Sequence, residues 1–335
     1  MFKTAILVLA LFLGQATAFW QYGHLFVAKI AYDKLEFTKE GQQALAKAND
    51  LLRVYSQKHP DMTNLEQNYP FVECATFADE IKAKGGSWQS GWHFVDQPYL
   101  DQGGSINDYP GFKFDTDSID LAIPAIVDWI KGTGNYRDSF VYKTMASSLS
   151  SLSEDERKSY ALRLLIHYVG DIHQPLHATA RVNPKYPKGD AGGNFVQIPI
   201  KGGAKNLHSI WDSVVYEYTA TPHMPFGSSD WSNLGSKAQG MESKYSFASS
   251  EWQNTNVKMW AQESYQLAKT NVYPDVVPGQ ALSAAYVNKN VPAIERSMVV
   301  GGLRLAYTIQ HIFGNGSEIP SIEDGQMPVD DGFLQ

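Results

Sequence analysis

Residues 165–178 read LIHYVGDIHQPLHA, and the rest of the chain is interpreted around this stretch. It ends an amphipathic run whose apolar residues recur at helical spacing, namely Leu162, Leu165, Ile166 and Val169. This spacing is typical of a helix packed against a core. Upstream, Ser153 is followed three residues later by Glu156, a capping-box signal for a helix start. Pro175 breaks the pattern, so we expect the helix to end near residues 172–174.

The predicted helix carries a histidine and an aspartate that can share one metal ion. His167 and Asp171 are at positions i and i+4, so both side chains lie on one face, one turn apart. His177 follows just past the helix end, and His208 with Asp212 repeats the pair in the segment NLHSIWD. One such pair is more often an ordinary hydrogen bond on a helix face. Two pairs together with His177 favour a zinc site.

Length and composition indicate a folded protein with a large core. The 335 residues are 43% hydrophobic and 19% charged, which excludes a disordered chain. The formal net charge is -7 and the sequence has no basic block, which argues against tight duplex DNA binding through phosphate neutralisation. A metal site can still recruit phosphate locally, because bound cations reverse the local field.

The first 18 residues have the pattern of a secretory signal peptide. Lys3 gives the positive start, residues 5–13 are apolar but too short to span a bilayer, and residues 16–18 fit the small-x-small cleavage rule. We therefore expect a secreted or lysosomal/vacuolar protein whose mature chain has no membrane span. Cleavage after residue 18 would make Phe19 the N-terminus. Its amine and carbonyl can chelate a metal together with His24, although alone His24 would merely mark a helix start.

Cysteine usage and the remaining segments complete the prediction of the fold. Cys74 is the single cysteine, so no intramolecular disulfide can form, and stability must come from core size or bound metal. Asn315 begins a possible glycosylation sequon.

We predict one mainly α-helical domain over residues 19–318 with little sheet, followed by an acidic, mobile tail over residues 319–335. The predicted helices after the first one cover residues 38–58, 70–85, 118–130, 206–218, 256–270 and 292–313, with loops at 101–117 and 181–193 and a small strand or hairpin at 193–200.

Six motifs, in chain order, carry a resemblance to a known family: FWQYGH, FADEIK, WHFVD, HYVGDIHQPLH, GGN and NLHSIWD. Over nearly the whole mature chain, the sequence resembles the zinc-dependent class I nucleases. These include fungal single-strand-specific nucleases, plant bifunctional nucleases and protist 3′-nucleotidase/nucleases. The resemblance implies a helical, phospholipase C/nuclease-like fold with three zinc ions in a cleft.

The resemblance also implies a ligand set for each zinc ion. The first set is Asp79, His93, His167 and Asp171; the second is His177, His208 and Asp212; the third is the amine and carbonyl of Phe19, His24 and again Asp171. Asp171 would therefore bridge a close pair of ions. Nitrogen and oxygen ligands with positions left for water are what catalytic zinc requires.

The implied activity is hydrolysis of single-stranded DNA or RNA and of nucleotides. Products would carry a 5′-phosphate, and 3′-nucleotidase activity is expected as well. Asp79, Asp171 and Lys82 are the expected catalytic residues, although Lys82 replaces the arginine usual in the family and lacks its bidentate fork. Phe94 and Asp96 resemble the pocket that stacks on a base and hydrogen-bonds its edge; alone, Phe94 could equally be a core residue. We expect a monomer with no stable protein partner.

Two features depart from the family pattern. The N-terminal residue of the family is normally Trp, whereas the five-residue spacing to His24 selects Phe19 and not Trp20 here. Because main-chain atoms make the bond, Phe should serve. Most secreted members carry disulfides, which this chain cannot form. We therefore expect it to depend more on zinc for stability.

Three other functions compete with this prediction. A bacterial-type zinc phospholipase C has a similar ligand order, but that family uses Glu where this chain has Asp212. An inactive, zinc-stabilised binding protein is disfavoured because all nine ligand positions hold suitable residues. A Ser-His-Asp hydrolase would need a G-x-S-x-G elbow, which is absent from the sequence. By helical phase His173 faces away from His167 and is expected to be structural, and no role is assigned to His59, His223 or His311.

Overall fold

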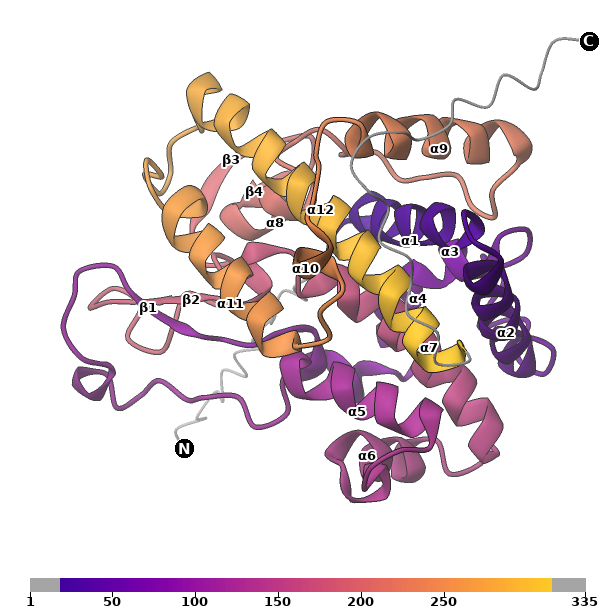
Figure 1. The fold of residues 1–335 in the computed structure, drawn as a ribbon. Coiled ribbons are helices and arrows are strands. Elements are labelled where there is room, and N and C mark those ends of the chain that lie inside the picture. The colour runs from indigo at the N-terminus through magenta and orange to yellow at the C-terminus, as the bar shows by residue number, and fades with distance from the viewer. Residues whose placement is uncertain (1–18, 315–335) are drawn as a thin grey trace, which may run out of the picture.

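The computed structural model describes residues 19–314 and shows a mainly helical domain with two very small sheets (Figure 1). The predicted fold class is therefore confirmed. The predicted signal peptide, the sequon at Asn315 and the acidic tail lie outside the described residues. The α-helices are α1 (Gln21–Glu36), α2 (Lys39–Ser56), α3 (Pro70–Glu73), α4 (Phe77–Glu80), α5 (Ile119–Lys131), α6 (Phe140–Ser148), α7 (Glu154–Asp171), α8 (Leu207–Asp212), α9 (Ser228–Glu242), α10 (Ser249–Trp252), α11 (Val257–Leu267) and α12 (Ala284–Phe313).

Helix α7 is the central helix of the domain. Its start is fixed by the predicted capping box, in which the Glu156 amide donates to Ser153 Oγ and the Ser153 amide donates to Glu156 Oε2. From residue 159 to residue 171 every side chain is buried, so this helix is surrounded by other elements on all sides. It packs against α1, α2, α5 and α12.

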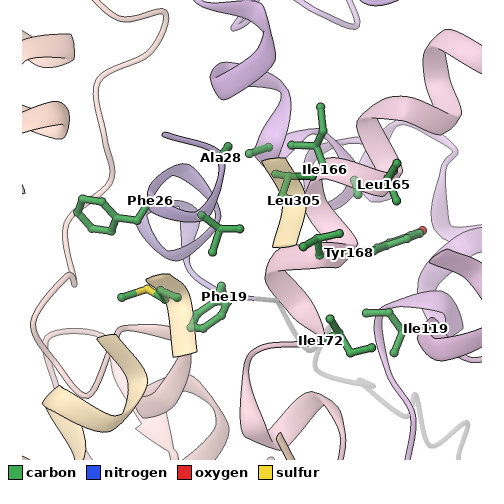
Figure 2. Packing of buried hydrophobic residues seen from close by; sticks show 14 of the residues in the cluster. Phe19, Phe26, Ala28, Ile119, Leu165, Ile166, Tyr168, Ile172 and Leu305 are labelled. Atoms are coloured by element: carbon green, nitrogen blue, oxygen red, sulfur yellow. The ribbon is translucent and has the colours of Figure 1, made fainter. Parts of the chain in front are cut away.

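The first and last long helices form the largest helix pair, α1 against α12 (Figure 1). In Figure 2, Ala28 of α1, Ile166 of α7 and Leu305 of α12 lie close together, while Phe26 of α1 and Leu165 of α7 lie to either side of them. All five side chains are buried. The three helices thus share one core, and the polar site described below is set into it.

The two sheets are short and have two strands each. β1 (Pro98–Leu100) pairs in parallel with β2 (Ala180–Val182), which joins the segment after Asp96 to the segment after His177. β3 (Gln197–Lys201) pairs antiparallel with β4 (Ala204–Asn206), confirming the small hairpin predicted around residues 193–200. Among the described residues, no helix combines the length and the apolar character needed to cross a bilayer.

Three predicted helices differ from the structure. Residues 70–85 form two short α-helices interrupted by 3₁₀ segments and ended by Gly85 at φ +92°. The helix predicted over 206–218 ends at Asp212, because the Asp212 carbonyl accepts a hydrogen bond from the Trp20 amide and Val214–Tyr216 have positive φ. The last helix begins at Ala284 and not at Pro292, because Ser283 caps it by accepting from the Tyr286 amide. Helices α6 and α9 were not predicted.

Candidate metal centre

The predicted ligands with side-chain donors come from six elements of the fold and meet at the C-terminal end of α7. This helix supplies His167 and Asp171, α1 supplies His24, α4 supplies Asp79 and α8 supplies His208 and Asp212. His93 and His177 end the 3₁₀ segments Ser87–His93 and Pro175–His177. Three groups of candidate ligand atoms result, and within each group the atoms lie within 4.8 Å of one another: His24, His167 and Asp171; Asp79, His93 and His167; His177, His208 and Asp212.

Asp171 is the centre of this arrangement. One of its carboxylate oxygens, Oδ2, lies 2.7 Å from His93 Nδ1 and 3.1 Å from His167 Nε2. The other, Oδ1, lies 3.2 Å from His177 Nδ1 and 3.4 Å from His24 Nε2. Its two oxygens therefore lie beside ring nitrogens of the His93–His167 group and of His24, which is the position required of a ligand that bridges these two groups.

Each of four histidines is held through one ring nitrogen, which leaves the other nitrogen facing the cluster. His167 Nδ1 lies 2.6 Å from the Ala75 carbonyl and His208 Nδ1 lies 2.7 Å from the Gly192 carbonyl. His177 Nδ1 lies 3.0 Å from the carbonyl of His93, and His93 Nε2 lies 2.7 Å from Gln89 Oε1. Metal-binding histidines are oriented by such second hydrogen bonds, which fix the ring and its tautomer.

The chemistry of the donor set fits bound metal ions. Several polar atoms of the cluster are buried and receive no hydrogen bond from the described residues: His24 Nε2, His167 Nε2, His177 Nε2, Asp171 Oδ1 and Asp212 Oδ2. Buried polar atoms without partners are rare because each costs free energy. Metal ions would satisfy all of them at once. The donors are imidazole nitrogens and carboxylate oxygens, a set that suits zinc and excludes a thiolate site.

Burial sets the protonation state of most of these groups. It lowers the pKa of His24, His93 and His177 well below the usual value, with neighbouring cations and imidazoles adding to the effect. For His167, the carboxylates of Asp171 and Asp79 outweigh burial and raise the pKa. Neutral imidazoles are the form that binds metal, so most of the histidines are prepared for it.

One glycine makes the approach of α1 to α7 possible. A Cβ atom at Gly170 would lie 2.6 Å from His24 Nδ1, too close for any other residue. With hydrogen in that place, the His24 and His167 rings stack at a centroid distance of 3.7 Å. The glycine between His167 and Asp171 is therefore required for the His24 group to form.

Two of the three residues predicted to contact the substrate, Lys82 and Phe94, lie next to the cluster. Lys82 Nζ donates to Asp79 Oδ1 at 2.7 Å, so the lysine charge lies beside one candidate ligand. The Phe94 ring lies 4.6 Å from the His177 ring and 6.1 Å from the His208 ring, between centroids. Asp96 lies beyond Phe94, where burial, with a contribution from nearby Asp115, raises the pKa of its carboxyl to about 7.

The segment before α1 also reaches the cluster. Phe19 is buried, and its ring meets the His24 ring edge-on at 5.8 Å. The next residue, Trp20, donates its amide hydrogen to the Asp212 carbonyl at 3.0 Å. The segment of residues 19 and 20 therefore lies next to His24 and to the end of α8, while a metal-binding role for the Phe19 main chain stays a prediction.

Two glutamines of the site were missed by the sequence analysis. Gln89 accepts from Tyr168 Oη at 2.5 Å and contacts His93 Nε2, while Gln174 donates to Asp212 Oδ1 at 2.7 Å. Gln174 lies within the stretch of residues 165–178 and Gln89 is four residues before His93, so their closeness in sequence to predicted ligands was the signal that could have identified them. His173 points away, as expected: its Nδ1 contacts the Val169 carbonyl at 2.7 Å.

The helical fold and its buried cluster of histidines and aspartates in three groups define this chain as a candidate metal-binding protein. A family model described as S1/P1 nuclease matches residues 19–314. The chain belongs to the S1/P1 nuclease family, a group of hydrolases that act on nucleic acids.

Three relatives illustrate the similarity. Endonuclease 2 of Arabidopsis thaliana is 27% identical over 306 residues, which cover 87% of this chain and 89% of the relative. Nuclease P1 of Penicillium citrinum is 28% identical over 258 residues, covering 73% and 84%. Nuclease S1 of Aspergillus oryzae is 25% identical over 249 residues, covering 69% and 75%. These matches favour the nuclease prediction over the phospholipase alternative.

Proposed function

We propose that this protein is a zinc-dependent phosphodiesterase that hydrolyses single-stranded DNA and RNA to products with a 5′-phosphate, and that it also removes phosphate from 3′-nucleotides. The observation that carries the proposal is the buried carboxylate of Asp171, which contacts His24, His93, His167 and His177 within 3.4 Å. A carboxylate shared by several imidazoles fits three zinc ions, two of them a close pair. Such ions lower the pKa of a bound water towards neutrality and stabilise negative charge on phosphate oxygens.

The protein residues have distinct roles in this reaction. Hydrolysis joins a water oxygen to phosphorus and breaks the bond to the 3′ oxygen, which takes up a proton. Of the three carboxylates in the cluster, Asp79 is 21% exposed, whereas Asp171 and Asp212 are buried. Asp79 can therefore accept a hydrogen bond from the attacking water and orient it. Lys82 Nζ lies 2.7 Å from Asp79 Oδ1, so its positive charge would be next to an oxygen of a phosphate bound at the cluster.

Substrate choice follows from the neighbourhood of Phe94. Its ring lies against the His177 and His208 rings, so a base stacked on it would place its 3′-phosphate at the cluster. Asp96 would hydrogen-bond the edge of that base. Stacking requires an unpaired base and tolerates any of them, which favours single strands over duplexes. The net charge of -7 agrees with recognition through local contacts and not through a broad basic surface.

The proposal includes the maturation of the chain. We infer that residues 1–18 are a signal peptide, that the nuclease domain extends over residues 19–318, and that the protein enters the secretory pathway as a monomer. Cleavage before Phe19 would provide a free amine beside His24, whose two ring nitrogens receive no hydrogen bond from the described residues. That amine and the Phe19 carbonyl would complete the third ligand set.

The test measures metal content, N-terminal sequence and activity on one secreted sample. We expect about three zinc ions per chain, Phe19 as first residue, faster cleavage of single-stranded than of duplex oligonucleotides, and 5′-phosphate ends. His24→Ala should lose zinc and activity. His223→Ala is the matched control, because that side chain is 81% exposed and its ring lies 3.3 Å from Asp230, which is not part of the cluster. A wild-type protein that hydrolyses phosphatidylcholine and no oligonucleotide would refute the proposal.

A further inference from the structure

A second recess adjoins the metal centre on the side away from Phe94. It has a volume of about 480 Å³, within the range of about 300–1,000 Å³ usual for small-molecule sites. Two cluster residues, His24 and Asp79, form part of its wall, together with the half-buried ring of Trp20. Phe94 contacts the opposite group, through His177 and His208. The cluster thus has an aromatic side chain at each end.

Trp20 is held firmly at the edge of this recess. Its amide donates to the Asp212 carbonyl at 3.0 Å and its carbonyl accepts from the Gly23 amide at 2.7 Å. Main-chain bonds on both sides fix the position of the residue relative to the cluster. A ring that is held in place and half exposed loses little entropy when a flat ligand stacks on it.

The wall next to Trp20 is a turn that has no side chains. Gly202 and Gly203 join β3 to β4 with φ +58° and +87°, which is the conformation of a two-residue type I′ hairpin turn. A Cβ at Gly203 would lie 3.4 Å from the Trp20 ring, and one at Gly202 would lie 2.7 Å from Thr219. The two glycines let the turn pack against Trp20 and Thr219 while leaving the recess open.

Polar groups line the remaining wall. Gln21, Glu80, Thr219 and Thr221 all belong to it. Glu80 Oε1 is buried and receives no hydrogen bond from the described part of the chain. A flat aromatic surface combined with polar side chains, one of them with an unpaired carboxylate oxygen, matches a nucleoside, which offers a base for stacking and hydroxyl or amino donors.

We propose that this recess, the Trp20 pocket, is a second nucleoside subsite, which holds the nucleoside that keeps the 5′-phosphate after cleavage. The inference rests on the proposed function. The nucleoside that loses its phosphate lies on Phe94, the scissile phosphate lies at the cluster, and the next nucleoside stacks on Trp20. A dinucleotide occupies both subsites, whereas a 3′-mononucleotide occupies only the one at Phe94.

The experiment compares two substrates in four variants of the full zinc-loaded enzyme. The substrates are a dinucleoside monophosphate and a nucleoside 3′-phosphate, and the readout is the ratio of their kcat/KM values. Trp20→Ala removes the stacking surface, Trp20→Phe restores an aromatic ring, and Ala220→Trp fills the exposed rim of the pocket. Phe37→Ala is the matched control, because Phe37 is an exposed aromatic (48%) at the far end of α1, about 24 Å from Trp20.

We expect the dinucleotide-to-mononucleotide ratio to fall about tenfold or more in Trp20→Ala and Ala220→Trp, to recover in Trp20→Phe and to stay constant in Phe37→Ala. The affinity for a nucleoside 5′-phosphate, measured by calorimetry, should fall in Trp20→Ala and Ala220→Trp, recover in Trp20→Phe and stay constant in Phe37→Ala. An unchanged ratio, whether both activities fall together or neither falls, would overturn the subsite. Wild-type protein that hydrolyses neither substrate would instead refute the proposed function.

Discussion

Removal of the bound metal is expected to destabilise this protein strongly. In the metal-free state, the five buried atoms His24 Nε2, His167 Nε2, His177 Nε2, Asp171 Oδ1 and Asp212 Oδ2, which we assign as metal-facing, have no hydrogen-bond partner among the described residues. Each unsatisfied buried group costs about 1–3 kcal/mol, so the five together cost about 5–15 kcal/mol. Without a disulfide, nothing covalent compensates for this loss, because Cys74 is the single cysteine and is buried.

A second estimate comes from mass action. An ion present at a thousand times its dissociation constant stabilises the folded state by about 4 kcal/mol, so three ions contribute about 12 kcal/mol. This value falls inside the range obtained from the unsatisfied atoms. At about 2 °C per kcal/mol for a domain of this size, the melting temperature should fall by about 10–25 °C when the metal is removed.

The assay is differential scanning calorimetry with and without a strong chelator at neutral pH. Metal content is measured on the same samples, and zinc added back in excess of the chelator should restore the melting temperature. If metal analysis shows complete removal while the melting temperature stays within about 3 °C, the unsatisfied atoms are not metal ligands. The ligand assignment would then be wrong.

Three further predictions concern single residues. Asp171→Asn should reduce the metal content from about three ions per chain to about one and lower activity at least about 100-fold, whereas the exposed Asp50→Asn should change neither; full metal content in the first variant would contradict the shared role. Lys82→Ala should lower kcat/KM about 10–100-fold and Lys82→Arg should retain most of it; equal losses would mean that the charge is not what matters. Burial, aided by Asp33, raises the pKa of Glu242 from 4.5 to about 7. The folded state then binds the Glu242 proton more tightly than the unfolded state, and stability falls as pH rises from about 4.5 to 7. By urea unfolding, Glu242→Gln should gain about 2–3 kcal/mol over wild type between pH 4.5 and pH 8, and a constant difference would refute the shift.

The sequence was sufficient for the elements whose signals are local. The start of α7 was predicted from Ser153 and Glu156 alone, and its end from Pro175. The pairing of His167 with Asp171, and of His208 with Asp212, followed from helical spacing. The convergence of His24, Asp79 and His93 on the same carboxylate has no local signal, since these residues lie far from Asp171 in sequence. Only the resemblance to a family predicted it.

Where the helix predictions were wrong, main-chain carbonyl groups hydrogen-bond residues of the metal centre. In a regular helix these carbonyls would accept hydrogen bonds from the amides four residues later. The Ala75 carbonyl contacts His167 Nδ1, and the Ala78 carbonyl accepts from Gln89 Nε2, so the segment 70–85 is irregular where it supports the cluster. The Asp212 carbonyl accepts from Trp20, and α8 ends there. Tertiary hydrogen bonds override helix propensity at these places, and no periodic pattern in the sequence records them.

The packing of the first long helix on the last one has a consequence for how the chain is made. Helix α1 ends at Glu36 and its main partner, α12, begins at Ala284. The ribosome needs about 10–50 s to synthesise the roughly 250 residues between them. During that time the side of α1 that packs on α12 is uncovered, although α2 and α7 are already present to contact its other sides. The candidate metal ligands all precede residue 213 and none belongs to α12. Metal uptake and closure of the core by α12 are therefore separate steps in the assembly of this protein.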